Sequence, residues 1–296
     1  MDSLKAFHDA KELCQVAPTE VLRLNGANSV WLVVRNEEPV AVMKYFESGL
    51  HSHSHFEIEL EFLKINSKKT FLPEVLIEDS HRKLLVLEYF KNTEDSRVDL
   101  SDLVALIREE IPSLRLPKSA HNGPVGILSW WEDGLKNFGT GERIVLEIAR
   151  SQQDFRDAIE HLKSSWSPDV LIHGDLKLQN LMLGADSPLV IDWESVGLGV
   201  RGWDEAGLLQ SVLVEAALEK NMASWAKQNI PILIDHVETA SPQIKDALVA
   251  RLIQTAIEYA QSSEAVPSDS VDVLQIAKYV CENNWHFLEE MSNGSR

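Results

Sequence analysis

Hydrophobic and polar positions change their spacing partway along this chain. In the first 90 residues the apolar positions form short runs separated by polar turns, which is typical of strands. The runs at 22–34, 40–44 and 83–90 predict four strands, the first run being two strands joined by a tight turn. Residues 56–63 have the three- and four-residue spacing of a helix. This part of the sequence therefore predicts a small sheet with one accompanying helix.

The rest of the chain is mostly helical in pattern, with one group of short strands. Residues 171–172, 181–183 and 187–191 predict buried strands on either side of a polar loop, and 184–186 is the turn between the last two. A capped helix is expected to start at 100–103, and 91–99 and 112–126 are expected to be connections. Further helices are predicted at 205–220, 241–262 and 268–291. The pattern is that of an α+β fold.

The charge balance limits the choice of partners. A formal net charge of −18 over 296 residues argues against nucleic acid, because binding a phosphate backbone requires clustered lysine and arginine. An acidic surface is compatible with a cationic small molecule as substrate. Solubility alone also explains such a surface. We therefore expect no nucleic-acid partner, and the acceptor of any reaction could be cationic.

The chain has no segment of the kind that enters a membrane. No run reaches the ~20 apolar residues that a membrane span requires, and residues 1–5 begin no hydrophobic signal stretch. Cys14 and Cys281 lie near opposite ends without metal-ligand spacing, so both are expected to be free thiols in a reducing compartment. The expected location is cytoplasmic, with no membrane partner.

The polar loop and the strand that follows it carry the strongest chemical signal. Asp175 could orient a substrate hydroxyl, while Asn180 and Asp192 offer oxygen ligands for magnesium. The predicted strands would bring these three residues to one ion. Turn residues of an ordinary hairpin explain each position singly, but not the return of polar residues after Ile191. The set indicates phosphoryl transfer from a magnesium nucleotide.

With His173-Gly174-Asp175 to Asn180 and Asp192-Trp193-Glu194, the chain resembles the aminoglycoside phosphotransferase and choline kinase superfamily. These are small-molecule kinases with a protein-kinase-like fold, and the resemblance covers most of the chain. It implies a small antiparallel-sheet lobe at 1–90 that binds ATP, and a larger helical lobe at 91–296 for catalysis and the acceptor.

The resemblance also implies a role for each matching residue. Asp175 would be the catalytic aspartate, Asn180 and Asp192 the Mg²⁺ ligands, and Asp204, in Gly202-Trp203-Asp204, the anchor of the catalytic loop. Lys177 departs from most of that family but matches protein kinases, where a lysine at this position neutralises the transferring group.

Other features argue against a protein kinase. Gly174 replaces the usual arginine, Asp192-Trp193-Glu194 replaces Asp-Phe-Gly, and no Ala-Pro-Glu segment follows.

The first 90 residues offer the parts of a nucleotide-binding lobe in the expected order. The turn containing Gly26 and Asn28 is short enough for its amides to cover phosphates. Lys44 ends an apolar strand and could be held against the phosphates. Of the glutamates in the following helix, Glu59 best fits the residue that fixes this lysine, with Glu57 and Glu61 as rivals.

The strand at 83–90 resembles the hinge between two lobes. Backbone groups of Glu88 and Phe90 would then face adenine.

Three further features have plainer explanations. The tract His51 to His55 could bind metal, but its place between the lysine strand and the glutamate helix favours a solvated loop. Of Trp130 and Trp131, at least one should pack in the core. The resemblance places the acceptor pocket among the late helices, where three acidic residues could meet an amine. They are Glu258, Asp269 and Asp272.

The resulting hypothesis is transfer of the γ-phosphoryl group of ATP to a hydroxyl of an aminoglycoside-like or amino-alcohol acceptor. A nucleotide-sensing or scaffold protein with little turnover is the alternative. The completeness of Lys44, Glu59, Asp175, Asn180 and Asp192 argues against it. A metal-dependent hydrolase built on His173, Asp175, Asp192 and the histidine tract is a third possibility, which lacks a helical His-x-x-x-His pair. The sequence indicates neither the acceptor nor the oligomeric state.

Overall fold

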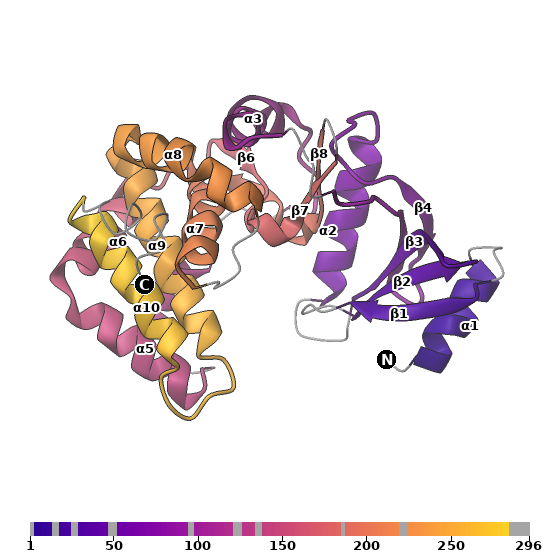
Figure 1. Cartoon of the computed structure of the whole chain (residues 1–296), viewed down its shortest axis with the longest axis horizontal. Coiled ribbons are helices and arrows are strands. Elements are labelled where there is room, and N and C mark those ends of the chain that lie inside the picture. The colour runs from indigo at the N-terminus through magenta and orange to yellow at the C-terminus, as the bar shows by residue number, and fades with distance from the viewer. Residues whose placement is uncertain are drawn as a thin grey trace. The chain divides into compact units, whose positions relative to one another are not determined.

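The structure is a computed structural model with two compact units, each described here by itself (Figure 1). Unit 1 comprises Met1–Arg97, Leu114–His121 and Asn180–Val196, and unit 2 comprises Val98–Ser113, Asn122–Gln179 and Gly197–Arg296. The units therefore interleave along the chain, and the lobe boundary at residue 90 stays a prediction. The structure describes residues 3–13, 18–24, 29–46, 52–93, 98–120, 126–133, 138–184, 187–218 and 224–283.

Unit 1 is built on an antiparallel sheet of five strands in the order β1-β2-β3-β5-β4. The strands predicted from the apolar runs are confirmed as β1, β2, β3 and β5, whereas β4 was not predicted. Its apolar run is only three residues long and contains no buried residue. The elements are α1 (Ser3–Leu13), β1 (Glu20–Leu24), β2 (Ser29–Arg35), β3 (Glu38–Tyr45), α2 (Ser52–Ile65), β4 (Val75–Asp79) and β5 (Leu84–Glu88).

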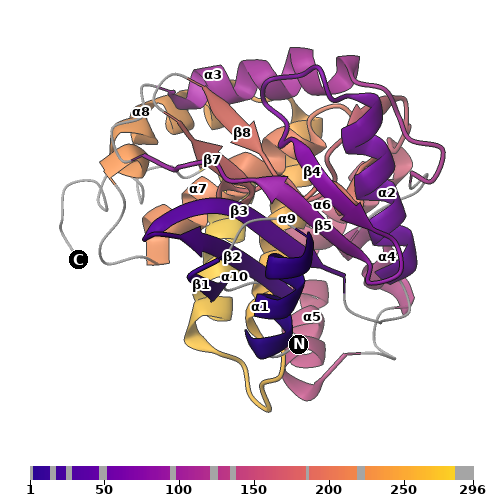
Figure 2. The same ribbon diagram turned by 90° about the vertical axis from the view of Figure 1, so that its right-hand side faces the viewer.

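The two faces of this sheet have different partners. Alternate residues of a strand point to opposite faces, so Met43 and Tyr45 of β3 lie on one face and Lys44 on the other. The Met43 face packs against Ala6 and Ala10 of α1, which lies against the sheet in Figures 1 and 2. The strand period thus places the lysine on the face away from α1.

Unit 1 also contains a short hairpin from later in the chain. β7 (Leu181–Leu183) pairs antiparallel with β8 (Pro188–Val190), as predicted, and a 3₁₀ turn, η5 (Trp193–Ser195), follows. Another 3₁₀ turn, η4 (Leu178–Asn180), leads into β7. The helix α2 packs against η5, where Phe62 stacks on Trp193 with ring centroids 4.4 Å apart.

The expectation of a solvated loop over the histidine tract was wrong for residues 52–55. These residues form the first turn of α2, whose buried Phe56 follows directly. Polar residues are compatible with a first helical turn, because its amide groups lack intrahelical acceptors there. His51 lies outside the described residues.

Unit 2 is mainly helical, and its helices include the three predicted after residue 204. The last of these ends at Cys281, and residues 284–291 of the prediction lie outside the described part. The helix α8 was not predicted as a separate element. The helices are α3 (Leu100–Ala105), α4 (Ile127–Asp133), α5 (Thr140–Ser151), α6 (Gln153–Ser164), α7 (Trp203–Leu218), α8 (Ser224–Thr239), α9 (Pro242–Tyr259) and α10 (Ser268–Cys281).

Two short strands and several irregular turns complete unit 2. β6 (Val170–Ile172) pairs antiparallel with β9 (Gly197–Gly199), so the polar loop leaves unit 2 from a buried strand. A π-helical turn, Leu106–Glu110, and a 3₁₀ turn, Ile111–Ser113, continue α3. The helix start predicted at 100–103 is capped, because the Asp99 side chain accepts from the Asp102 amide. At the start of α9, the Ser241 side chain accepts from the Ile244 amide.

The structure confirms two minor expectations. Trp131 is buried, while Trp130 is half-buried and meets the Phe138 ring edge-on. Cys281 is a free thiol, half-buried, whereas Cys14 lies outside the described residues. Among the residues that the structure describes, none of the helices is both long and apolar enough to span a membrane.

Candidate active site

Lys44 occupies a buried position on the face of the sheet away from α1. Its side chain is 6 % exposed, so its charge needs partners inside the protein. The Nζ atom lies 2.5 Å from Glu59 Oε2 and 3.1 Å from Glu194 Oε2, and it also pairs with Asp192. The lysine thus holds together a helix, the strand that carries it and the turn after β8.

The structure distinguishes the three glutamates of α2. Glu59 is fully buried and pairs with Lys44, as predicted. Glu57 is exposed. Glu61 accepts hydrogen bonds from the amides of Lys118 and Ser119, which ties a later connection to the helix. Of the three glutamates, Glu59 is the one that pairs with Lys44, because it lies on the same helical face as the buried Phe56 and Leu63.

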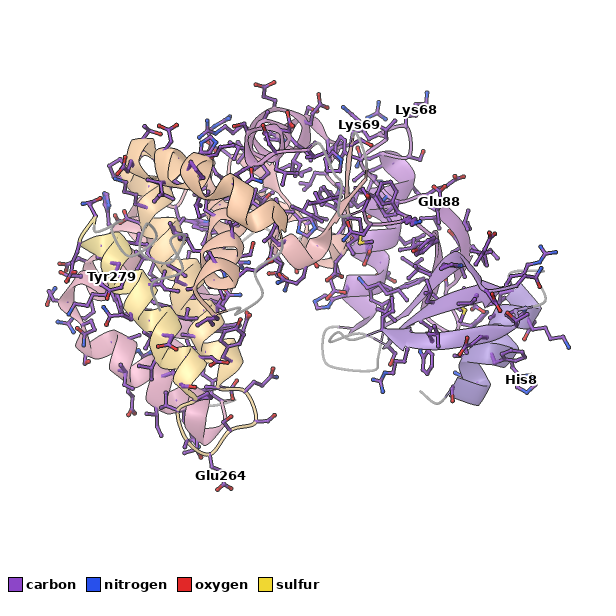
Figure 3. The ribbon with its side chains drawn as sticks, in the orientation of Figure 1. His8, Lys68, Lys69, Glu88, Glu264 and Tyr279 are labelled. Atoms are coloured by element: carbon purple, nitrogen blue, oxygen red, sulfur yellow. The ribbon has the colours of Figure 1, made fainter. Side chains whose placement is uncertain are left out.

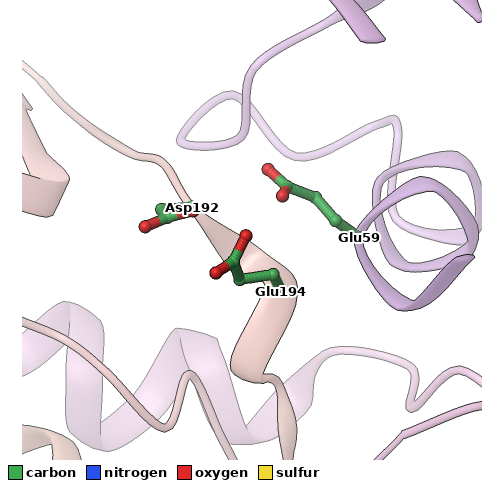
Figure 4. A group of neighbouring side chains, drawn as sticks. All are labelled: Glu59, Asp192 and Glu194. Carbon is green, nitrogen blue, oxygen red and sulfur yellow. The ribbon is translucent and has the colours of Figure 1, made fainter. Parts of the chain in front are cut away.

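Trp193 explains why two carboxylates reach the lysine from one turn. Its ring is fully buried and its Nε1 donates to the Val190 carbonyl at 2.8 Å. The residues on either side, Asp192 and Glu194, both pair with Lys44. Figure 4 shows these two side chains together with that of Glu59. Asp192 adopts a left-handed backbone conformation with φ 69°, which aspartate tolerates better than most residues. Glu194 was not assigned a role from the sequence.

Three carboxylates surround one ammonium group, so the cluster has an excess of two negative charges when all three are ionised. Burial raises the pKa of Glu59 to about 7, and the charge of Lys44 offsets this only in part. Burial lowers the pKa of Lys44, but the three carboxylates outweigh that effect and hold it above its ordinary value. A divalent cation would balance such a cluster.

The carboxylates have a spacing that suits a metal ion. One oxygen from each of Glu59, Asp192 and Glu194 lies within 4.8 Å of the others. Oxygen ligands of this kind suit the hard ions Mg²⁺ and Ca²⁺. Asn180 is buried, and its carbonyl accepts from the Ile191 amide at 3.0 Å, which places its backbone next to the residue that precedes Asp192. The donor set therefore fits the predicted magnesium site in chemical type.

In unit 2, the loop after β6 is fixed by Asp204. This buried carboxylate accepts from the amides of His173 at 2.6 Å and Gly174 at 3.0 Å. Burial raises the pKa of Asp204 above its ordinary value, although these amides, the nearby His173 and Arg251 oppose the effect. The predicted anchoring role of Asp204 is confirmed by these two hydrogen bonds.

Trp203 secures the same loop from the preceding position. Its Nε1 donates to the Gly174 carbonyl at 3.0 Å. Two consecutive residues at the start of α7 therefore bind the backbone immediately before Asp175.

Asp175 has a cation on each carboxylate oxygen. Lys177 Nζ lies 2.8 Å from Oδ2, and Arg251 Nη2 lies 2.9 Å from Oδ1. Burial raises the pKa of Asp175, but Arg251 and Lys177 together outweigh it, so the net pKa lies below the ordinary aspartate value. The carboxylate is ionised at neutral pH and can accept a hydrogen bond from a hydroxyl.

Sequence reasoning missed Arg251, although a signal was present. Arg251 interrupts the run from Ala247 to Ile253, whose other members are all buried and apolar. A charged residue within an apolar stripe of a helix has a partner inside the protein in most cases. The partner itself, 76 residues earlier, could not be read from the pattern.

The remaining predicted nucleotide contacts stay predictions. Gly26 and Asn28 lie outside the described residues. The Glu88 side chain is exposed at the end of β5 and is labelled in Figure 3, and its amide donates to the Glu74 carbonyl at 3.0 Å. The Phe90 ring packs next to Gly184, where a Cβ atom would come within 2.7 Å of it. Any adenine contact through Glu88 would therefore involve its carbonyl rather than its amide.

Of the acidic residues considered for the acceptor, Glu258 lies near the catalytic loop. Its charge acts on Lys177, and its Oε1 accepts from Gln254 Nε2 at 2.8 Å. Asp269 and Asp272 are exposed on α10. A separate surface hollow of about 570 Å³, lined among others by His161, Asp246 and Cys281, includes none of the predicted site residues.

Residues 20–229 match the model of a family described as the phosphotransferase enzyme family. The match spans more than half of the chain, and it includes Lys44, Glu59, Asp175, Asn180 and Asp192. This chain belongs to the phosphotransferase enzyme family. The prediction of a phosphotransferase is confirmed at this level, and the scaffold alternative is not favoured. No curated protein matches the sequence significantly.

Several solved structures share the fold of this chain. The choline kinase LicA from Streptococcus pneumoniae matches with a TM-score of 0.62 and 14% identity, over 95% of this chain and 100% of that one. A choline/ethanolamine kinase family protein from Mesorhizobium loti has a TM-score of 0.61 and 14% identity, over 99% of each chain.

Amicoumacin kinase hAmiN, solved with AMP-PNP, Ca²⁺ and Ami, has a TM-score of 0.57 and 14% identity, over 96% of this chain and 94% of that one. Identities this low concern the fold alone. The predicted α+β, protein-kinase-like fold is confirmed.

Proposed function

We propose that this protein transfers the γ-phosphoryl group of ATP, bound as its Mg²⁺ complex, to a hydroxyl of a small amine-bearing molecule. The observation that carries the proposal is the buried Lys44 with its three carboxylates. A purely structural ion pair needs one carboxylate, whereas a metal–phosphate complex needs additional acidic oxygens and a fixed cation. The negative charge of the three carboxylates exceeds the single positive charge of Lys44, which supports a divalent ion at this site.

The residues of unit 1 would hold the donor. Asp192, Asn180 and Glu194 would supply oxygen ligands to Mg²⁺, and Glu59 would keep Lys44 in place for the nucleotide phosphates. When bound, Mg²⁺ neutralises charge on the β- and γ-phosphates. We further propose that the turn with Gly26 and Asn28 covers the phosphates, and that the Glu88 carbonyl and the Phe90 amide contact adenine.

The residues of unit 2 would prepare the acceptor. The ionised Asp175 accepts a hydrogen bond from the acceptor hydroxyl and takes its proton, while the hydroxyl oxygen bonds to the γ-phosphorus. The bond between that phosphorus and the β–γ bridging oxygen breaks, and its electron pair leaves with ADP. Lys177, which lies beside Asp175, would neutralise the transferring group.

Glu258 supports an amine on the acceptor. A carboxylate close to Lys177 and bonded by Gln254 would attract a cation near the reacting hydroxyl. The solved kinases that the fold matches are named for choline, ethanolamine and amicoumacin, which supports the same class. Glu258→Gln should therefore raise KM for a cationic acceptor without changing KM for ATP.

The test is magnesium-dependent ADP production across a panel of aminoglycosides, choline, ethanolamine, homoserine, hydroxylysine, methylthioribose and fructosamines. One acceptor should stimulate turnover in the parent protein. Asp175→Asn should lower kcat by at least ~10²-fold, the usual size of a general-base effect, while ATP still binds. Asp169→Asn, an equal change at an exposed aspartate before β6, should leave kcat unchanged.

Two results would count against the proposal. Full activity in Asp175→Asn would remove the assigned base. An unchanged magnesium-dependent ATP affinity in Asp192→Asn would remove the assigned metal ligand.

A further inference from the structure

Arg251 makes an ion pair with Asp175 that differs in kind from that of Lys177. Lys177 belongs to the same loop, two residues on, and its side chain is 34 % exposed. Arg251 reaches the carboxylate from α9, and its side chain is 5 % exposed. A buried guanidinium has fewer available orientations than an exposed lysine. Arg251 can therefore restrict the carboxylate where Lys177 can follow it.

The surroundings hold the Arg251 side chain in place. The guanidinium lies over the Trp203 ring, 5.6 Å from its centroid, and Trp203 also donates to the Gly174 carbonyl. A Cβ atom on Gly207 would lie 3.3 Å from Arg251 Nε and 2.4 Å from the Leu176 carbonyl oxygen. A glycine at this point of α7 therefore leaves room both for the loop backbone and for the arginine.

The contacts of Arg251 do not satisfy all of its hydrogen-bond donors, so stability alone does not explain its place in the protein. Its Nε is buried without a hydrogen-bond partner among the described residues, and only Nη2 bonds to Asp175. An apolar side chain in this stripe of α9 would avoid burying a charge and an unpaired donor. A role of the Arg251 charge in the reaction would account for the cost of burying it.

We propose that Arg251 is a positioning residue, which holds the Asp175 carboxylate in one orientation toward the acceptor hydroxyl. The proposal rests on the proposed function, because it assigns Arg251 a part in the same transfer. With both oxygens held by cations, Asp175 is a weak base that orients the hydroxyl and receives its proton late. A weak base is sufficient for a loose transition state, because the attacking oxygen keeps its proton until bonding to phosphorus is advanced.

Lys177, Glu258, Asp204 and His173 are the charged or titratable groups near this ion pair in the described part of unit 2. Lys177 and Arg251 favour the ionised form of Asp175. Glu258 acts on Lys177, Asp204 lies within the influence of Arg251, and His173 Nδ1 accepts from the Asp175 amide at 3.3 Å. Losing Arg251 leaves one cation against the burial of the carboxylate, so the pKa of Asp175 rises. The activity that requires ionised Asp175 is then lost at a higher pH.

The experiment compares Arg251→Met and Arg251→Gln with Arg251→Lys and a matched control. The control is Arg108→Met, which removes the arginine that pairs with the buried Glu205 through two hydrogen bonds elsewhere in unit 2. Both neutral variants should lose ~10- to 100-fold in kcat with KM for ATP unchanged, and the acidic limb of kcat/KM should move up by about one pH unit. In Arg251→Lys, the acidic limb of kcat/KM should return to the pH of the parent, and kcat should recover in part. Arg108→Met should keep kcat and the limb of the parent.

A second measurement is independent of turnover. The titration of Asp175 is followed by ¹³C NMR of aspartate carboxyl groups in the nucleotide-free protein, with Asp175→Asn to assign the signal. The proposal requires this signal to titrate at a higher pH in whichever neutral variant folds. An unchanged titration, or full kcat in a neutral variant, would overturn it. If no acceptor is found but the titration moves, the proposed function fails while the role of Arg251 on Asp175 stands.

Discussion

Gly207→Ala tests whether the packing of α7 against the catalytic loop sets the position of Asp175. The new Cβ atom would lie 2.4 Å from the Leu176 carbonyl oxygen, whereas ordinary contacts begin near ~3.4 Å. The loop backbone next to Asp175 must then move by about 1 Å. A misplacement of about 1 Å can cost ~10²-fold in rate.

The same substitution should cost little stability. Overpacking of a core costs ~1–3 kcal/mol, while replacing glycine by alanine within a helix returns about 1 kcal/mol. The net loss is therefore about 0–2 kcal/mol. The expected outcome is a folded protein with a melting temperature lowered by a few degrees and a kcat lowered by ~10²-fold.

Gly141→Ala is the matched control. Its Cβ atom would also meet backbone, 2.8 Å from the Ser263 carbonyl oxygen, but at the start of α5 and away from the loop. Thermal melts and kcat for the acceptor are measured for both variants. We expect similar losses of stability and a kcat within twofold of the parent for Gly141→Ala alone. A folded Gly207→Ala protein with parental kcat would refute the reasoning.

Three further predictions concern other groups. Glu59→Gln should raise KM for ATP by about tenfold or more, because a buried charge-assisted hydrogen bond contributes ~1.5–3 kcal/mol. Glu57→Gln, at an exposed site of the same helix, should leave KM for ATP unchanged. Equal effects of the two substitutions would argue against the Lys44–Glu59 pair. Ser241→Ala should lower the free energy of unfolding, measured by urea denaturation, by about 1 kcal/mol, because the Ser241 side chain caps α9. The control Ser268→Ala, one residue inside α10, should change this free energy by less than ~0.5 kcal/mol. Burial, with Asp154, Asp246 and Glu282 nearby, raises the pKa of Cys281 to about 12, so the thiol stays protonated at pH 8. In a Cys14→Ser background it should react with a disulfide reagent at least ~10-fold more slowly than free cysteine, with a rate still rising at pH 10, and a rate equal to that of free cysteine would contradict this.

The parts of the site that sequence reasoning found are those with a local pattern. Lys44 lies at the end of an apolar strand and Glu59 on a helix with an apolar face, and such strand and helix patterns can be read within one window of sequence. The roles of both residues, and that of Asp204, came from the resemblance to the aminoglycoside phosphotransferase and choline kinase superfamily.

The missed parts depend on contacts between distant segments. Glu194 reaches Lys44 only because Trp193 is buried under Phe62, and Arg251 meets Asp175 only because α9 packs beside α7. The helical start at 52–55 was missed for another reason, since polar first turns resemble loops in sequence. Pairings of this kind are set by tertiary packing, which no single window of sequence contains.

The central claim is tested most directly by ³¹P NMR of a complete reaction mixture containing the protein, MgATP and the stimulating acceptor. The account predicts one equivalent of a phosphate monoester on the acceptor for each ADP formed, and no product with Asp175→Asn. ADP accompanied only by inorganic phosphate would show hydrolysis instead, and would contradict the assignment of a hydroxyl-directed phosphotransferase.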